Sequence, residues 1–228
     1  MVDLLLYGYM PTDFVQFGAL HLFIIAMVPA LAFALSKGPR WARIPLGVFL
    51  LINEIIWYAF KLRTEGWRFP EGLPIQLCDL TLWLTVISLL TLNQWVFEAA
   101  YFLGIAGASM AIIQPELWAP VASYPTAYFF LAHGGIVIAI LYLVWGKIAR
   151  PRPGCLLRVL IMVNGYAAVV GCFNAVFHTN YMFLCRKPQV ASLLDFFGPW
   201  PIYILAGEAM AMLLFTLLYI PFRRQAAK

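Results

Sequence analysis

The sequence predicts an all-α fold, a polytopic membrane bundle of about seven transmembrane helices. The first reason is composition: 64% of the 228 residues are hydrophobic and only 11% are charged, whereas soluble domains carry about 25% charged residues. The second is that the apolar residues fall into stretches of about 20, the length that crosses a bilayer core. No soluble domain is left over, so we expect a single integral membrane domain over residues 1–228. The protein is predicted to be a multi-pass protein of the cell membrane.

Short loops separate the predicted spans. The third span begins at Pro74, a residue favoured in the first turn of a helix. The fourth contains Gly104 and Gly107, which let helix backbones approach closely. The fifth contains His133, which two glycines follow directly. In chain order, the predicted spans cover residues 14–35, 41–62, 74–92, 95–113, 125–145, 155–177 and 200–222.

Positive charge predicts the orientation of the bundle. Lys and Arg number ten on one side of the predicted spans and five on the other, and the richer side faces the cytoplasm. We therefore expect the N-terminus outside and the C-terminus in the cytoplasm. The longest outer loop, residues 178–199, is too polar to span the membrane and is rich in aromatic residues. We expect it to cap the outer mouth of the bundle; an interfacial loop anchored by its Trp and Tyr side chains is the alternative.

Polar side chains from six of the spans share a similar predicted depth below the outer surface. A helix rises about 1.5 Å per residue, so the distance from a predicted helix end gives the depth. Glu98 and Asn164 are exceptions, since both fall nearer the cytoplasm. Ionisable groups within a membrane line a bundle interior or a wet cavity, so this layer predicts a polar cavity open to the outer leaflet. Its predicted members are His21, Glu54, Cys78, Asp79, His133, Asn174 and Glu208.

Cys78 is the predicted nucleophile of this cavity. A thiol attacks as its thiolate, which a nearby base favours, and His133 is the first candidate for that base, with His21 second. A Cys-His pair supports acyl transfer, in which the thiolate attacks an ester carbonyl and the histidine protonates the leaving oxygen. A hydroxyl then takes the acyl group from the thioester. Gln76, Asn174 or backbone N–H groups at the start of the third helix are candidates to stabilise the oxyanion.

Other interpretations of the same residues stay open. Asp79 beside the thiol disfavours the thiolate, unless its carboxylate orients a histidine. Cys78 can also be a small packing residue or the disulfide partner of Cys185. The histidines can be hydrogen-bonded core residues. Glu54 and Glu208, together with the histidines, can instead serve a membrane transporter or small-ligand receptor, although no inverted repeat or pair of broken helices supports one.

The sequence also limits the expected partners. The cysteines are scattered without a CxxC pair, so we expect neither a metal site nor a cofactor. The net charge of +5 comes without an array of basic and aromatic residues, so no nucleic-acid partner is expected. Membrane lipids, as phospholipid or fatty-acyl ester, are the expected substrates. The residues expected to support catalysis or bind substrate are His21, Glu54, Gln76, Asp79, Asn174, His178, Asn180, Tyr181, Lys187, Asp195 and Glu208.

Four blocks of sequence resemble a known family. QLCDLTLWL, AHGGI, FNAVFHTNYMFLCRKP and SLLDFFGPWP look like the YwaF-type bacterial integral membrane proteins, and the likeness runs over nearly the whole chain. That family is related to the eukaryotic transmembrane protein 164 group of cysteine-dependent lipid acyltransferases, and is more distantly similar to the androgen-induced intramembrane hydrolases. The resemblance implies a lipid acyltransferase or hydrolase of the bacterial inner membrane. It also implies that Cys78 occupies the nucleophile position and His133 the partner position.

Overall fold

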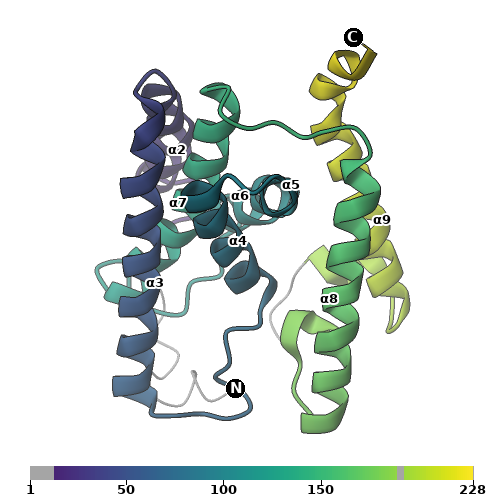
Figure 1. The fold of residues 1–228 in the computed structure, drawn as a ribbon. Coiled ribbons are helices and arrows are strands. Elements are labelled where there is room, and N and C mark those ends of the chain that lie inside the picture. The colour runs from purple at the N-terminus through teal and green to yellow at the C-terminus, as the bar shows by residue number, and fades with distance from the viewer. Residues whose placement is uncertain (1–12, 189–192, 228) are drawn as a thin grey trace. The chain divides into compact units, whose positions relative to one another are not determined.

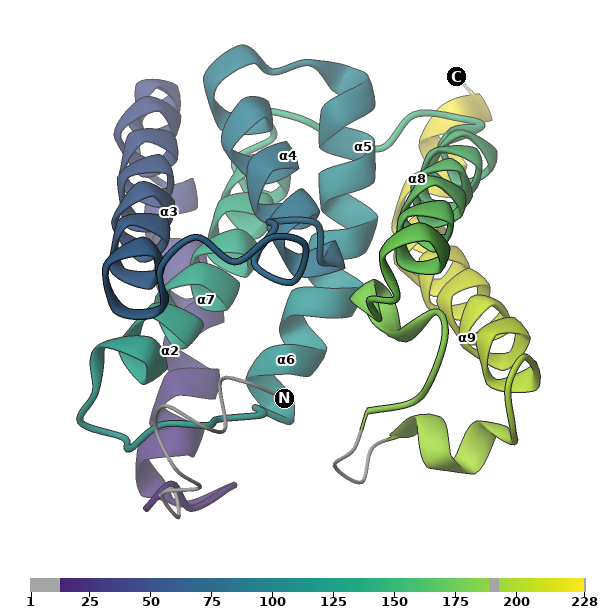
Figure 2. The same cartoon turned by 90° about the horizontal axis from the view of Figure 1, so that it is seen from below.

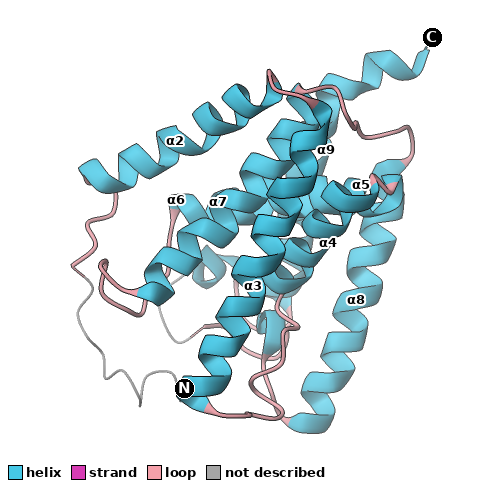
Figure 3. Ribbon diagram, turned by 60° about the vertical axis from the view of Figure 1, so that its left-hand side comes forward, coloured by secondary structure: helices cyan, strands magenta, loops and turns pink. Residues whose placement is uncertain are grey.

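All regular secondary structure is helical in the computed structural model, which describes residues 13–188 and 193–227 (Figure 3). Six helices are long and apolar enough to cross a membrane, and α4 is a shorter apolar helix. The prediction of an all-α, multi-pass membrane protein is therefore confirmed. In chain order, the elements are α2 (Ala19–Ser36), η1 (Arg40–Ala42), α3 (Arg43–Glu65), α4 (Leu77–Thr91), α5 (Gln94–Leu103), the π-helical turn η2 (Gly104–Ala108), α6 (Ser109–Ile113), α7 (Tyr124–Trp145), α8 (Cys155–Phe177), η3 (Tyr181–Phe183), η4 (Leu193–Phe197), α9 (Ile202–Tyr219) and η5 (Ile220–Ala227) (Figure 1).

The helices group into two compact units. The first comprises residues 1–64 and 81–150, and the second comprises residues 65–80 and 151–228. Most of α4 belongs to the first unit, whereas its first turn belongs to the second. Cys78 is thus a residue of the second unit, and His133 is a residue of the first.

Helix α4 begins at Leu77, later than the Pro74 expected from the sequence. Its 15 residues extend about 22 Å, which is less than the core of about 30 Å that a full span crosses. The residues just before Leu77 do not join the helix because side chains of the second unit bind their backbone, as at the carbonyl of Ile75. The third predicted span is therefore a short helix with an irregular approach.

Helix α7 forms the centre of the first unit. Ile136, Ile140 and Leu143 of this helix are buried, and α2 packs along it (Figure 3). Gly135 lies against Leu50 of α3 so closely that a Cβ atom at position 135 would overlap the leucine side chain. Gly135, two residues after His133, therefore lets α3 approach the backbone of α7.

Side chains of the first unit bind carbonyl groups at the ends of its helices. Arg43, at the start of α3, donates from Nη1 to the carbonyls of Leu89 (2.5 Å) and Leu90 (2.8 Å) near the end of α4. Tyr142 of α7 donates to the carbonyl of Pro39 (3.1 Å). The last carbonyls of a helix lack intrahelical partners, and a membrane interior offers them no water. The Arg43 contacts thus stabilise the end of α4, and the Tyr142 contact holds the short connection between α2 and α3.

A π-helical turn joins α5 to α6 in one continuous ribbon (Figure 2). A Cβ atom at Gly104, the first residue of this turn, would lie 2.9 Å from Cγ2 of Ile136 on α7. A Cβ atom at Gly107 would meet nothing within 4 Å. Gly104 is therefore a close-packing position, whereas Gly107 is not.

The second unit consists of two long helices and the chain segments that pack on them. Phe173 and Phe177 of α8 contact Phe69, with ring centres 6.4 and 5.1 Å away. Asn164 of α8 donates to Glu208 of α9 at 2.7 Å. The segment that leads from α3 to α4 is therefore packed on α8.

Replacing Gly104 by alanine is expected to destabilise the first unit. The added methyl group has to displace Ile136, and overpacking of this kind costs about 1–3 kcal/mol. Gly107→Ala is the matched control, because it adds the same methyl group and the same helix propensity without a clash. We expect Gly104→Ala to lower the midpoint of thermal unfolding in detergent relative to Gly107→Ala. Equal midpoints for the two variants would contradict this packing argument.

Candidate functional site

Cys78 is the second residue of α4, and its side chain is exposed. The first N–H groups of a helix lack intrahelical partners, and the helix N-terminus carries a partial positive charge. Both features favour a thiolate, whereas the carboxylate of the adjacent Asp79 favours the neutral thiol. The start of α4 therefore supplies part of the activation that a nucleophilic cysteine needs.

Two polar residues beside Cys78 form the cap of this helix. Asp79 accepts a hydrogen bond at Oδ2 from the backbone N–H of Gln76 (3.0 Å), which is the reach-back half of a capping box. The Oε1 atom of Gln76 accepts from the N–H of Met182 (2.9 Å). Helix capping thus accounts for an acidic residue beside the thiol. The Gln76 amide, a sequence-based candidate for the oxyanion site, ties the helix start to η3.

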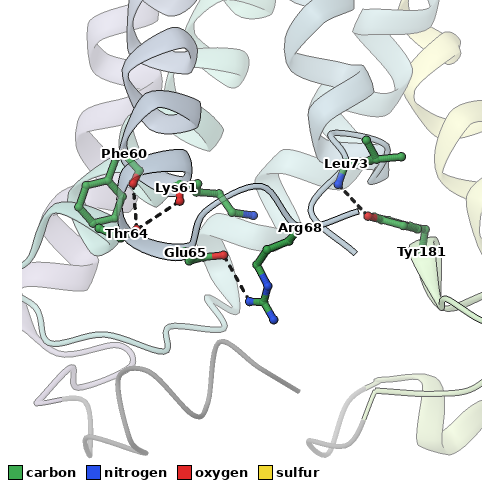
Figure 4. Close-up of polar contacts among 7 residues, drawn as sticks. All are labelled: Phe60, Lys61, Thr64, Glu65, Arg68, Leu73 and Tyr181. Carbon is green, nitrogen blue, oxygen red and sulfur yellow. Dashed lines mark hydrogen bonds and ion pairs between the residues drawn. The ribbon is translucent and has the colours of Figure 1, made fainter. Parts of the chain in front are cut away.

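Two tyrosines hold the chain that leads into α4. The Tyr181 hydroxyl accepts from the N–H of Leu73 (2.9 Å) (Figure 4). It donates to the carbonyl of Pro70 (2.7 Å). Burial raises the pKa of the Tyr181 phenol, against the opposing effect of the Leu73 N–H, so the phenol keeps its proton. Tyr166 of α8 donates to the carbonyl of Ile75 (2.9 Å). Sequence reasoning missed Tyr166, although a lone tyrosine hydroxyl within an apolar span was a usable signal.

Asn174, at the end of α8, anchors the loop that carries Tyr181. Its buried side chain accepts at Oδ1 from the Thr179 hydroxyl (2.7 Å) and from the N–H of Tyr181 (2.9 Å). Its Nδ2 atom donates to the carbonyl of Tyr181 (3.0 Å). Both ends of the amide are therefore bonded to this loop. Because the carbonyl of Tyr181 uses one of the two hydrogens on Nδ2, the oxyanion role considered from the sequence would fall to the other hydrogen of this buried amide.

The remainder of the loop is held by local contacts. Asn180 accepts at Oδ1 from the N–H groups of Cys185 (3.1 Å) and Arg186 (3.0 Å). Lys187 lies 3.9 Å from the carboxylate of Asp195. A salt bridge in which both side chains are partly exposed contributes little stability. The predicted headgroup ligand Lys187 thus already has an acidic neighbour.

Two further predictions concern exposed loop residues. His178 ends α8 with a left-handed φ of 57°, and its side chain is exposed. Cys78 and Cys185 are both free thiols, so the disulfide considered from the sequence is not formed.

Glu208 and Asn164 correct one detail of the predicted polar layer. Their hydrogen bond of 2.7 Å joins two residues that the sequence placed in opposite halves of the membrane. The depth estimate counted residues from predicted helix ends, which does not fix how far α8 and α9 are offset along one another. Asn164 therefore lies at the level of Glu208 rather than apart from it.

His133 of α7 presents one ring nitrogen as a base. Its Nδ1 atom lies 2.8 Å from the carbonyl of Phe129. A carbonyl can only accept a hydrogen bond, so Nδ1 carries the proton and Nε2 keeps its lone pair. The half-buried imidazole also lies beside the Phe129 ring, with centres 4.4 Å apart. This arrangement fixes the tautomer that a general base uses at Nε2.

His21 has a structural arrangement instead. It is fully buried, and its Nδ1 atom accepts from the N–H of Phe17 (2.8 Å) while Nε2 donates to the carbonyl of Ile112 (2.7 Å). Both ring nitrogens are therefore bonded to the backbone. His21 ties the start of α2 to the end of α6, and neither nitrogen is available for proton transfer without breaking a hydrogen bond.

Glu54 of α3 is a buried carboxylate within an aromatic cluster. Its Oε2 atom accepts from the Tyr128 hydroxyl at 2.6 Å. The Tyr128 ring stacks on Trp57, with centres 4.1 Å apart and an interplanar angle of 8°. The hydrogen bond to Tyr128 lowers the cost of placing this carboxylate inside the unit.

The structure divides the predicted site residues between the two units. Among residues 13–188 and 193–227, no three His, Cys, Asp or Glu residues form a group that could hold a metal ion. The first unit contains His21, Glu54 and His133, and the second contains Gln76, Cys78, Asp79, Asn174, His178, Asn180, Tyr181, Lys187, Asp195 and Glu208.

Alanine substitution is expected to separate the two histidines. His21→Ala leaves a backbone N–H and a carbonyl without their partner, and each such buried group costs about 1–3 kcal/mol. His133→Ala releases only a carbonyl of its own helix, so its effect on stability should be smaller. We expect thermal unfolding in detergent to show a clearly lower midpoint for His21→Ala than for His133→Ala. A larger loss in His133→Ala would contradict the structural assignment of His21.

Comparison with known proteins supports one relationship. No curated protein and no solved structure matches the chain. A family model described as the TMEM164 family matches residues 7–219, which include Cys78, His133 and the Asn174–Tyr181 loop. This relationship agrees with the resemblance carried by the sequence blocks around these residues. The chain therefore belongs to the TMEM164 family.

Proposed function

We propose that this membrane protein is a lipid acyltransferase or ester hydrolase, with Cys78 as nucleophile and His133 as general acid and base. The observation that carries the proposal is the exposed Cys78 thiol in the first turn of α4, where the helix terminus favours the thiolate. The Nε2 atom of His133, left as a base by the bond from Nδ1 to Phe129, supports it. The resemblance to cysteine-dependent lipid acyltransferases adds a second line of support.

The proposed reaction has two stages. In the first, the Cys78 thiolate attacks an ester carbonyl of a membrane lipid, and the C–O bond to the alcohol breaks. The His133 imidazolium gives its Nε2 proton to the leaving oxygen, and a thioester on Cys78 remains. In the second, His133 takes a proton from water or from a second alcohol, whose oxygen attacks the thioester. The acyl group leaves with that oxygen, and the Cys78 thiolate is regenerated.

Backbone N–H groups are the preferred oxyanion donors in this proposal. The carbonyl oxygen becomes negative as the thiolate adds, and donors fixed in advance stabilise that charge. The N–H groups of the first turn of α4, which have no carbonyl of a preceding turn to bind, lie on the same helical turn as Cys78. The contacts of Gln76 with Met182 and of Asn174 with the N–H of Tyr181 are accepted by the amide oxygens, so they orient these side chains without using the N–H donors that an oxyanion needs. The backbone N–H groups are preferred because the helix itself fixes their direction beside Cys78.

A transporter or small-ligand receptor remains the alternative function, and no specific contact favours it. Such a protein would use Glu54, Glu208 and the histidines to bind a proton or a ligand. Glu54 accepts from Tyr128, Glu208 accepts from Asn164, and His21 is bonded to backbone at both nitrogens. Each of these groups thus has a neighbour that explains its presence in an apolar unit.

Substitution of Cys78 tests the proposed function directly. Cys78→Ala should abolish release of fatty acid or transfer of an acyl group from phospholipid in proteoliposomes, and a thioester-trapping acyl probe should no longer label the protein. His133→Gln should lower the rate by about 10²- to 10⁴-fold, the usual contribution of general acid–base catalysis. Cys172→Ala is the matched control, because Cys172 is also an exposed thiol but lies several turns after the start of α8.

The outcome separates the two functions. Turnover and probe labelling that persist in Cys78→Ala would eliminate Cys78 as nucleophile. Substrate uptake or ligand binding that survives Cys78→Ala but disappears in Glu208→Gln would instead support the transporter or receptor.

A further inference from the structure

The segment that delivers Cys78 to the start of α4 has little regular structure of its own. Between the end of α3 at Glu65 and the start of α4 at Leu77, the described chain forms turns rather than a helix. Four of its polar groups are bonded to α8 or to the loop after it. The groups and their partners are the carbonyl of Pro70 and the N–H of Leu73 with Tyr181, the carbonyl of Ile75 with Tyr166, and the side chain of Gln76 with the N–H of Met182.

Tyr181 makes the largest contribution among these residues, because its one hydroxyl group forms hydrogen bonds with two backbone groups of the same turn. Its hydroxyl accepts from the N–H of Leu73 (Figure 4) and donates to the carbonyl of Pro70, which closes the turn around the hydroxyl group. The side chain is only 5% exposed, and its ring contacts Phe173 of α8 with centres 6.0 Å apart. The phenol therefore cannot turn away without losing both packing and hydrogen bonds.

The backbone of Tyr181 is fixed as firmly as its side chain. The Asn174 amide binds both the N–H and the carbonyl of Tyr181, and Thr179 donates to the same amide oxygen. Asn174 is 1% exposed, so water does not compete for these bonds. The position of the phenol is thus set from the end of α8.

The loop also keeps an unfavourable backbone conformation. His178, Met182 and Phe183 have positive φ angles of 57°, 57° and 53°, which cost roughly 1–2 kcal/mol per non-glycine residue. Such conformations persist only where surrounding contacts over-determine them. At Met182, the N–H bond to Gln76 is one such contact, and it reaches the residue that immediately precedes α4.

From these contacts we propose that Tyr181 is a positioning residue for Cys78. Tyr181 fixes the Pro70–Leu73 turn, and Met182 fixes Gln76. Together these contacts set where the first turn of α4 places the thiol. The inference rests on the proposed function, in which Cys78 is the nucleophile. Its consequence is that the reactivity of Cys78 depends on a tyrosine hydroxyl more than 100 residues further along the chain.

The test measures thiol reactivity without any lipid substrate. The full chain is prepared in lipid nanodiscs with Cys78 as its only cysteine, after Cys155→Ala, Cys172→Ala and Cys185→Ala. Alkylation by iodoacetamide is followed as a function of pH. In this background, Tyr181→Phe keeps the ring and removes both hydrogen bonds. We expect it to slow alkylation at neutral pH by about three- to tenfold, the effect of losing one or two ordinary hydrogen bonds, and to move the midpoint of the profile to higher pH.

Tyr142→Phe is the matched control. Tyr142 is also a buried tyrosine whose hydroxyl binds backbone carbonyls, those of Pro39 and Arg40 in the first unit. Its substitution removes a comparable set of bonds and should leave the alkylation profile of Cys78 unchanged. A general loss of rigidity would move both profiles, whereas loss of positioning moves only that of Tyr181→Phe.

If Tyr181→Phe does not fold, a second variant tests the same proposal. Gln76→Leu removes only the acceptor for Met182 at an exposed position, and it should shift the profile in the same direction. Profiles of folded Tyr181→Phe or of Gln76→Leu that overlay the parent would overturn the proposal. A shifted profile together with ester turnover that survives Cys78→Ala would retain the positioning role and reject Cys78 as the nucleophile.

Discussion

Backbone polar groups that are buried away from water have to find their partners within the chain. Helices meet this requirement by themselves, but the irregular segment between α3 and α4 does not. Here Tyr181, Tyr166 and Gln76 complete the hydrogen bonds, and Asn174 holds the loop from which Tyr181 acts. The contacts that make this segment possible are also those that place Cys78 at a helix terminus. Stability of the segment and chemistry at the thiol therefore depend on the same residues.

The same requirement explains why two histidines in one unit differ in their available chemistry. His21 bonds an N–H at one nitrogen and a carbonyl at the other, which leaves no lone pair for catalysis. His133 bonds only a carbonyl of its own helix, through Nδ1, so that Nε2 stays a base. Position within an apolar span does not distinguish the two residues. The distinction comes from whether an orphan backbone group at a helix end needs the imidazole.

Sequence reasoning predicted the long helices because their signal is local: an apolar run of bilayer length has one stable form. It placed the start of α4 too early because the partners of residues 70–76 lie about 100 residues further along the chain. The partners of His21 did not emerge from the sequence because they are backbone groups, which no residue type identifies. Cys78, Asn174 and Tyr181 were identified as candidates because polar groups next to apolar spans require a reason. Which of them cap, anchor or react follows only from their contacts.

The four cysteines differ in exposure and in their position relative to the start of a helix, and these two properties decide which thiol is suited to react. Cys155 begins α8, where the helix terminus favours a thiolate, but its side chain is fully buried. Cys172 is exposed several turns after the start of an apolar helix, where no free N–H groups and little water stabilise a charge. Cys185 is exposed in a loop, away from any helix start. Only Cys78 combines exposure with the first turn of a helix, so physical reasoning and family resemblance point independently to the same residue.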